Sequence, residues 1–349
     1  MNTQILRVNP NDPEVGLIKI AAEVIKRGGL VAFPTETVYG LGADAFNPEA
    51  VRKIYVAKGR PLDNPIIVHI SSREMLGEVA VELPELAWRL ISKFWPGPLT
   101  LVLRRNPRLP ELTVAGLDTV AVRMPRHRVA LRLIEEAERP IAAPSANLSG
   151  SPSPTRAEHV IKDLYGRVDI IIDGGETEIG LESTVLSLVS TPPMILRPGG
   201  VTLEQLKEEI GEVKIHPVVL AEKELDNILA QSPGMKYRHY APKAELLVVQ
   251  GERQNVKKKI RELLEKYMQK GVRTGVLYIG KSGYGASEEI SLGETGDLVE
   301  VARNLFASLR ELDERGVEVI IAEGVEERGL GLAIMNRLKK AASGRIIRV

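Results

Sequence analysis

The chain has 349 residues, of which 44% are hydrophobic and 27% charged, and its 47 lysines and arginines nearly balance its 46 aspartates and glutamates. This length and hydrophobic share exclude a disordered chain and predict two domains. The charge balance excludes bulk attraction to nucleic acid or anionic membranes, and the absence of cysteine excludes disulfides, thiolate catalysis and cysteine-ligated zinc. Because we find neither a signal-peptide pattern nor a membrane-length apolar run, we expect a soluble cytoplasmic protein.

The first half of the chain mixes helix and strand patterns. An amphipathic helix is predicted over 13–27, a buried strand over 30–33, and a helix over 48–58 with Asn47 as its N-cap and Gly59 at its end. Further strands are predicted over 66–70, 99–104, 119–124, 140–145, 169–173 and 184–189, and helices over 84–94, 127–138, 155–165 and 202–210. Strict alternation is missing, so residues 1–211 predict an α/β domain with a partly antiparallel sheet.

The second half begins with a segment rich in proline, glycine and polar residues, 212–243, which we interpret as an interdomain linker. Residues 244–349 then alternate regularly between apolar runs and helical patterns. Strands are predicted over 246–250, 274–279, 317–322 and 345–349, and helices over 254–270, 297–315 and 331–342. This alternation predicts a smaller, Rossmann-like parallel domain.

Three glycine motifs resemble nucleotide-binding loops. Residues 275–282 match the P-loop spacing, but the spacer residues are themselves an apolar strand, so we reject ATP binding there and expect Lys281 to be a solvated loop residue. The pair Gly40 and Gly42 lacks a strand directly before it, and the pair Gly329 and Gly331 lacks the third small residue. Tight turns are the favoured interpretation of both pairs, with a minor anion site as the alternative for the second.

Cations and hydroxyl groups gather in five segments of the first domain: PTETVYGLG, KGRPLDNPIIVH, SANLSG, GLESTV and ILRPGG. Lys58, Arg60 and Arg197 suit phosphates; helix C-terminal capping is the common alternative, but it would account for only one of the cations around Gly59. Arg123 and Arg197 each end an apolar strand, where a surface salt bridge is the alternative to binding a carboxylate or phosphate. His69 lies within an apolar strand and is as compatible with a buried structural role as with catalysis. No nucleophile is paired with a base, so the pattern favours a reaction driven by positioning and electrostatics.

These segments, in this order over about residues 10–210, resemble the threonylcarbamoyl-adenylate synthase family with its YrdC-like catalytic domain. The stretches SPGMKYRHYAP and GLGLAIMNRLKKA resemble its long, two-domain form. The resemblance implies a twisted, mixed, open sheet with helices, followed by the smaller Rossmann-like domain. It also implies a reaction of L-threonine, bicarbonate and ATP, with Mg2+, that forms threonylcarbamoyl-AMP and pyrophosphate for the modification of adenosine 37 in tRNA.

The resemblance assigns roles to individual residues. Lys58, Arg60, Ser145 and Asn147 are the implied catalytic group. ATP is assigned to Lys58, Arg60, Asn64, Thr119, Ser145, Asn147, Ser153, Arg197 and Tyr240, with Tyr237 and Tyr240 closing over the site. L-threonine is assigned to Thr35, Thr37, His69, Arg123, Ala143 and Ser183. We expect Mg2+ to be carried on the ATP phosphates rather than by protein ligands.

Two other functions remain open. One is carbamoyl transfer through a carbamoyl-adenylate, which related modules perform within larger proteins that carry zinc-finger cysteines. The other is a non-catalytic RNA-binding module, which the near-neutral charge and the 4% aromatic content disfavour. We expect a downstream tRNA threonylcarbamoyl transferase as a partner, and neither stable nucleic-acid binding nor membrane association.

Overall fold

The computed structural model describes residues 2–220 and 239–349, which form two compact units. Unit 1 contains the residues up to Ser149 and Ser153–Val219, and the described part of unit 2 contains Gly150–Pro152, Leu220 and residues 239–349. Residues 212–219 were expected in the linker, but they belong to unit 1, where Val213, Val218 and Val219 are buried. The expected linker residues 221–238 lie outside the described part of the chain.

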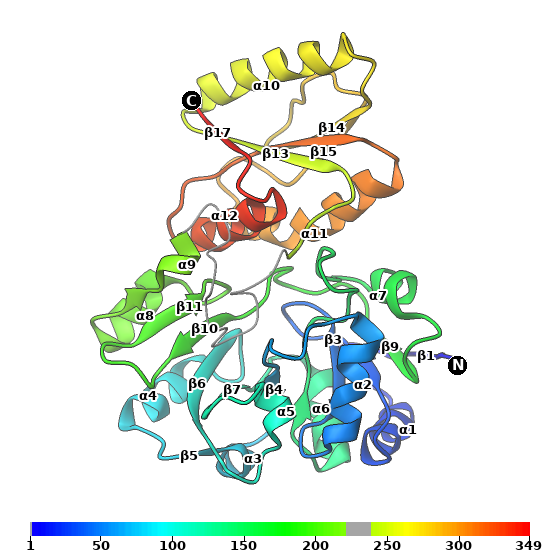
Figure 1. The fold of residues 1–349 in the computed structure, drawn as a ribbon, viewed down its shortest axis with the longest axis vertical. Coiled ribbons are helices and arrows are strands. Elements are labelled where there is room, and N and C mark those ends of the chain that lie inside the picture. Colours follow the sequence, from blue (N-terminus) through cyan, green and yellow to red (C-terminus); the bar gives the residue numbers. More distant parts are fainter. Residues whose placement is uncertain (1, 221–238) are drawn as a thin grey trace. The chain divides into compact units, whose positions relative to one another are not determined.

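Unit 1 is an α/β structure (Figure 1). Its strands are β1 (Gln4–Arg7), β2 (Val31–Phe33), β3 (Gly40–Asp44), β4 (Ile67–His69), β5 (Ala80–Val81), β6 (Leu99–Arg105), β7 (Thr119–Arg123), β8 (Ile141–Ala142), β9 (Ile170–Asp173), β10 (Thr184–Ser187), β11 (Met194–Arg197) and β12 (Lys214–Ile215). Its helices are α1 (Val15–Lys26), α2 (Pro48–Lys58), α3 (Arg73–Val79), α4 (Glu85–Phe94), α5 (Glu111–Val114), α6 (Arg128–Ala137), α7 (Ala157–Leu164), α8 (Leu203–Ile210) and α9 (Pro217–Leu220).

The strands of unit 1 form one mixed sheet. Among the described residues it has 12 strands in the order β1-β9-β2-β3-β8-β4-β7-β6-β10-β11-β12, with β5 pairing with β6. The pairs β2–β3 and β6–β7 are antiparallel, whereas β4–β7 and β6–β10 are parallel. The expectation of a mixed sheet is therefore confirmed.

Both faces of this sheet are covered. Val31 and Phe33 pack in a core with α1 and α6, whereas Ala32 between them packs in a second core with α2, α4 and α7. Alternate residues of a strand point to opposite faces, so β2 is buried on both sides, as its uninterrupted apolar run predicts.

Helix α2 has the boundaries predicted from its capping residues. Asn47 Oδ1 accepts hydrogen bonds from the backbone N–H groups of Glu49 and Ala50, each at 3.1 Å. Pro48 occupies the first helical position, and Gly59 ends the helix with a φ of 62°, a left-handed conformation that glycine adopts without strain. The chain then turns immediately after Lys58.

The tight turn predicted at Gly40 and Gly42 was wrong, because these residues lie in β3, paired antiparallel with β2. Gly42 is required there by packing. A Cβ atom at this position would lie 2.7 Å from both Ile141 Cγ2 and Phe33 Cε1. The sequence alone does not reveal that side chains from two other strands pack against this glycine.

Replacing Gly42 with alanine is therefore expected to lower the free energy of unfolding by about 1–3 kcal/mol, the usual cost of an overpacked core. Gly77→Ala is the matched control, since a Cβ there meets nothing within 4 Å and Gly77 lies in helix α3. That variant is expected to be neutral or more stable by up to about 1 kcal/mol. Urea denaturation of both variants measures these changes, and an equal change in the free energy of unfolding would contradict the packing argument.

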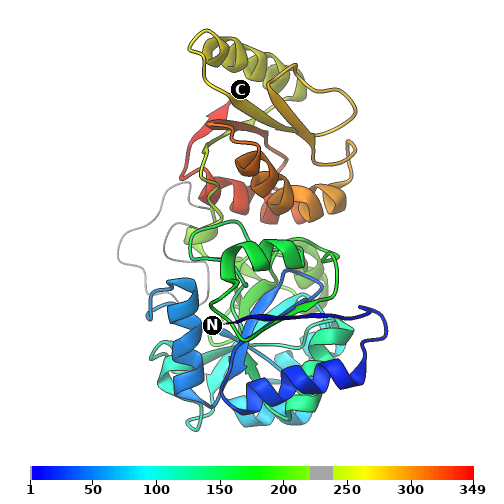
Figure 2. The ribbon, with the colours of Figure 1, turned by 90° about the vertical axis from the view of Figure 1, so that its right-hand side faces the viewer.

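Unit 2 is the smaller, parallel α/β unit that the alternating pattern predicts. Its strands are β13 (Glu245–Gln250), β14 (Thr274–Tyr278), β15 (Glu288–Ser291), β16 (Val319–Glu323) and β17 (Ile346–Arg348), and its helices are α10 (Arg253–Met268), α11 (Leu298–Glu314) and α12 (Leu330–Ala341). In the described chain the sheet order is β15-β14-β16-β13-β17, and each of these pairs is parallel. Helix α10 covers one face, and α11 and α12 cover the other (Figures 1 and 2).

The glycine motifs of unit 2 are structural. Gly275 lies inside strand β14, and Lys281 is an exposed loop residue whose Nζ lies 3.7 Å from a carboxylate oxygen of Glu294, so the rejection of a P-loop is confirmed. A Cβ atom at Gly331 would lie 2.0 Å from the carbonyl oxygen of Glu326, which explains that glycine by close backbone approach. Strand β15 was missed because its sequence, EEIS, has no apolar run.

Candidate active site

The loops and strand ends of unit 1 bring the predicted threonine residues together. His69 ends β4 and Arg123 ends β7, and the two residues are direct partners in the parallel register. Arg123 Nη1 donates to Thr37 Oγ1 at 2.9 Å, and the hydroxyl oxygens of Thr37 and Thr35 lie 2.8 Å apart. Thr35, Thr37, His69 and Arg123 are all buried. Because Arg123 is buried, it does not form the surface salt bridge that was the alternative, and its role in binding a substrate stays a prediction.

Glu36 belongs to this cluster, and the sequence analysis missed it. Its Oε2 lies 2.7 Å from Arg123 Nη2, and the two side chains are 1% and 4% exposed. Such a pair is expensive to desolvate, and removing one partner leaves an uncompensated buried charge. The available signal was an acidic residue three positions after an apolar strand, between two threonines already assigned to the site.

His69 is a buried, neutral imidazole. Burial, and then the nearby charge of Arg123, lower the pKa of His69 to about 3. Its ring packs edge-on against Phe33 with a centroid distance of 6.3 Å. An imidazole that stays neutral at physiological pH can accept or donate a hydrogen bond to a ligand, but it supplies no positive charge.

This pKa shift predicts a pH dependence of stability. An unfolded histidine titrates near pH 6.5, so between pH 6.5 and 3 the unfolded chain binds a proton that folded His69 does not. Acidification through this range therefore favours unfolding by about 1.4 kcal/mol per pH unit from this residue. Urea denaturation between pH 7.5 and 5 is expected to show a steeper loss for the wild type than for His69→Asn, and parallel curves would refute the prediction.

Lys58 lies at the end of α2 and is 3% exposed. Its Nζ donates to the carbonyl oxygens of Ser145 and Asn147, each at 2.5 Å, and its own carbonyl accepts from the N–H of Ser149 at 2.9 Å. The ammonium group thus contacts another loop and does not cap its own helix. Three of the residues assigned to ATP are thereby brought together.

Arg60 and Asn64 occupy the loop after α2. Arg60 Nε donates to the carbonyl of Asn64 at 3.2 Å, and Arg60 Nη2 donates to that of Pro65 at 2.9 Å. Asn64 is 1% exposed, and in the described part of the chain neither atom of its side-chain amide has a hydrogen-bond partner. Buried amides are almost always paired, so the two unsatisfied atoms make Asn64 a candidate ligand contact.

Arg197 and Ser183 join the two predicted sets of substrate residues. Arg197 Nε donates to the carbonyl of Ser183 at 3.0 Å, and Nη2 donates to Ser183 Oγ at 3.1 Å. Thr100 Oγ1 lies 2.7 Å from the same hydroxyl, a contact that the sequence analysis missed. A residue assigned to ATP and a residue assigned to L-threonine are therefore in direct contact.

The remaining predicted residues are placed more widely. Ser153 Oγ donates to a carboxylate oxygen of Glu182, and the backbone N–H of Ala143 donates to the carbonyl of Ile67 at 2.9 Å. Thr119 begins β7, at the opposite end of the strand from Arg123. Tyr240 belongs to unit 2, where its ring stacks on Phe306 with a centroid distance of 5.3 Å. Tyr237 lies outside the described residues, so the expected closure by both tyrosines stays a prediction.

Two family models together match most of the chain. The Sua5–YciO–YrdC model, described as "Telomere recombination", matches residues 23–199, and the model of the threonylcarbamoyl-AMP synthase C-terminal domain matches residues 201–343. The chain belongs to the threonylcarbamoyl-AMP synthase family. The resemblance inferred from the five segments is thereby confirmed, including its two-domain form.

Full-length relatives support the same conclusion. A threonylcarbamoyl-AMP synthase of Pyrococcus abyssi (strain GE5 / Orsay) is 58% identical over 332 residues, which cover 95% of this chain and 96% of that protein. The enzyme of the same name from Bacillus subtilis (strain 168) is 50% identical over 98% of this chain and 96% of its own length. The crystal structure of P. abyssi Sua5 complexed with L-threonine matches with a TM-score of 0.95 and 56% identity, covering 99% of this chain and 100% of that one.

This family membership settles the class of reaction. Like its family, the chain is a transferase that forms threonylcarbamoyl-AMP for tRNA threonylcarbamoyladenosine synthesis, as expected. The expected fold is confirmed as well, and E. coli YciO matches with a TM-score of 0.53 and 26% identity over 56% of this chain and 96% of that one. Neither carbamoyl transfer nor a non-catalytic RNA-binding role is supported by these relatives.

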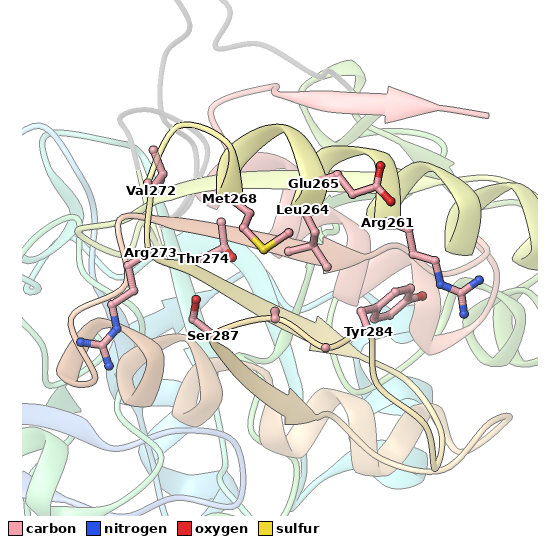
Figure 3. Close-up of a pocket in the computed structure, with 12 residues that line it drawn as sticks. Arg261, Leu264, Glu265, Met268, Val272, Arg273, Thr274, Tyr284 and Ser287 are labelled. Atoms are coloured by element: carbon pink, nitrogen blue, oxygen red, sulfur yellow. The ribbon is translucent and has the colours of Figure 1, made fainter.

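A cavity of about 490 Å³ lies within unit 2 (Figure 3). Arg261 and Arg273 lie at opposite ends of it, with Leu264 and Met268 of α10 between them. The guanidinium of Arg273 is paired with Glu288 at 2.9 Å, and no residue predicted for the active site lines the cavity. We assign it no role in the reaction.

The described residues contain no group of three or more histidine, aspartate or glutamate side chains arranged to hold a metal ion. Within residues 2–220 and 239–349, no helix combines the length and apolar character needed to cross a membrane.

Proposed function

We propose that unit 1 holds L-threonine and ATP side by side, so that a carbamate made from L-threonine and bicarbonate attacks the α-phosphorus of ATP. The contact between Arg197 and Ser183 carries this proposal, because it joins the residues assigned to each substrate. The carbamate oxygen forms a bond to phosphorus, pyrophosphate leaves, and threonylcarbamoyl-AMP is the product. The carbamate is itself the nucleophile, so the protein supplies positioning and positive charge.

L-threonine is proposed to bind among Thr35, Thr37, His69, Arg123 and Ser183, with the backbone of Ala143 beside it. These side chains are buried, as a small polar substrate requires if water is to be excluded from it. Arg123 suits the carboxylate because a guanidinium offers parallel N–H donors to two oxygens. The crystal structure of P. abyssi Sua5 complexed with L-threonine supports this class of ligand.

ATP is proposed to bind Lys58, Arg60, Asn64, Ser145, Asn147, Ser153 and Arg197, with Thr119 as a further candidate. Lys58 and Arg197 are buried cations, and a buried cation stabilises the charge that develops on a phosphate more than an exposed one does. The unpaired amide of Asn64 is the clearest place for a hydrogen bond to the nucleotide.

Mg2+ fits this site as an ion carried by ATP phosphates. Magnesium is usually held by substrate phosphates, water and one or two carboxylates, and the Glu182 carboxylate beside the Ser153 hydroxyl offers hard oxygen donors of that kind. When bound, the ion would neutralise negative charge on the leaving pyrophosphate. A downstream tRNA threonylcarbamoyl transferase as the acceptor of the adenylate, and a cytoplasmic location, complete the proposal.

The test is pyrophosphate release by the full chain, with ATP and Mg2+, while L-threonine or bicarbonate is omitted in turn. Dependence on both, with threonylcarbamoyl-AMP detected by mass spectrometry, is the expected result, and EDTA is expected to abolish it. Release that needs carbamoyl phosphate instead would identify the carbamoyltransferase reaction. Tight RNA binding without turnover would identify the binding module.

A further inference from the structure

Glu36 carries a buried carboxylate that the chemistry above does not use. Its side chain is 1% exposed, and its charged partner is Arg123 Nη2, 2.7 Å from Oε2. Neither carboxylate oxygen accepts a hydrogen bond with good geometry from the described residues. Leaving a buried carboxylate without hydrogen-bond donors is costly, so a donor from outside the chain is expected at this position.

The groups around Glu36 define which donor fits. Arg123 of β7 directs Nη1 to Thr37 Oγ1 at 2.9 Å and Nε to the carbonyl of Gly97 at 3.2 Å. His127, before α6, lies within electrostatic range of Glu36, and burial lowers its pKa. His69 of β4 is the strand neighbour of Arg123 and stays neutral. An adjacent carboxylate and guanidinium therefore offer opposite charges to a ligand that carries both an ammonium and a carboxylate group.

We infer that Glu36 binds the α-ammonium group of L-threonine and removes one of its protons, which makes the amine nucleophilic. This inference rests on the proposed placement of L-threonine beside Arg123. The proton passes from nitrogen to the Glu36 carboxylate and later to solvent. The free amine then forms a bond to the carbon of bicarbonate, and a second amine proton leaves with the bicarbonate hydroxyl as water, which gives the carbamate.

Replacing Glu36 with glutamine keeps the shape of the side chain but removes its charge and its basicity. We expect kcat/KM for L-threonine to fall by about 10²–10⁴-fold, the range of a lost general base, while KM for ATP changes less than twofold. Glu36→Asp is expected to recover part of the loss. Glu178→Gln is the matched control, because Glu178 also pairs with an arginine, Arg126 at 2.9 Å, but is 65% exposed. That variant is expected to retain wild-type kinetics.

The pH profile separates a proton acceptor from a residue that only holds Arg123. Without the base only the free amine reacts, so kcat/KM for L-threonine in Glu36→Gln is expected to rise about tenfold per pH unit below the pKa of the substrate amine. The kcat/KM of the wild type for L-threonine should rise much less steeply with pH. A loss that is the same at every pH, or that affects ATP and L-threonine equally, would overturn the inference.

A measurement on the wild-type chain covers the case in which Glu36→Gln does not fold. The analogue 2,3-dihydroxybutanoate keeps the carboxylate, the carbon chain and the 3-hydroxyl group of L-threonine but carries a hydroxyl in place of the 2-amino group. We expect calorimetry to show that it binds at least tenfold more weakly than L-threonine, and equal affinity would refute the inference. If the wild type releases pyrophosphate without L-threonine, the proposed function itself fails; if release requires L-threonine but the Glu36 tests fail, only this inference does.

Discussion

Replacement of Lys58 with methionine is expected to lower kcat/KM for ATP by about 10³-fold, the scale on which loss of a preorganised charge acts. The Lys58 ammonium is buried between the carbonyls of Ser145 and Asn147, so the variant loses both a cation and the contacts that hold this loop. Steady-state pyrophosphate release with varied ATP measures the effect. KM for L-threonine is expected to change little.

Lys53→Met is the matched control for this experiment. Lys53 lies on the same helix and also donates to a backbone carbonyl, that of Gly28 at 2.7 Å, but it contacts none of the predicted site residues in the described structure. It is expected to retain activity within about twofold. Equal losses in the two variants would show that α2 acts only through stability and would remove Lys58 from the active site.

Replacement of Arg123 with methionine is expected to lower the free energy of unfolding by about 3–5 kcal/mol, the cost of leaving one member of a buried ion pair without its partner. Glu36, whose side chain is 1% exposed beside Arg123, would lose the countercharge that lies 2.7 Å from its Oε2. Urea denaturation at pH 7 measures the change. A loss below about 1 kcal/mol would mean that water or another group reaches Glu36.

The double variant Arg123→Met with Glu36→Gln completes a double-mutant cycle for this buried ion pair. Because the glutamine carries no charge, the double variant is expected to be more stable than Arg123→Met alone by about 1–3 kcal/mol. Exposed Arg126 and Glu178 provide the comparison cycle, for which a coupling of at most about 1 kcal/mol is expected. Similar coupling in both cycles would contradict the burial argument.

The sequence by itself determined the elements whose signals are local. Helix α2 has the predicted limits because Asn47, Pro48 and Gly59 act within one turn of the residues that they cap. Apolar periodicity likewise predicted the parallel unit from β13 onward. The cations and hydroxyls of the five segments could be listed as a group because their chemical types suit an anion, whatever the fold.

Only the tertiary structure decided which of these groups meet. Glu36 and Arg123 are far apart in sequence and pair because the loop after β2 reaches the end of β7, where β4 also places His69. Position 42 of β3 requires glycine because the side chains of Phe33 and Ile141 pack against it, and Ser183 contacts Arg197 because the segment before β10 folds against β11. Such long-range contacts carry no local periodicity, so no window of sequence contains them. The pairing of strands thus decided which charged and polar side chains lie next to one another in the site, whereas the sequence determined which side chains are present.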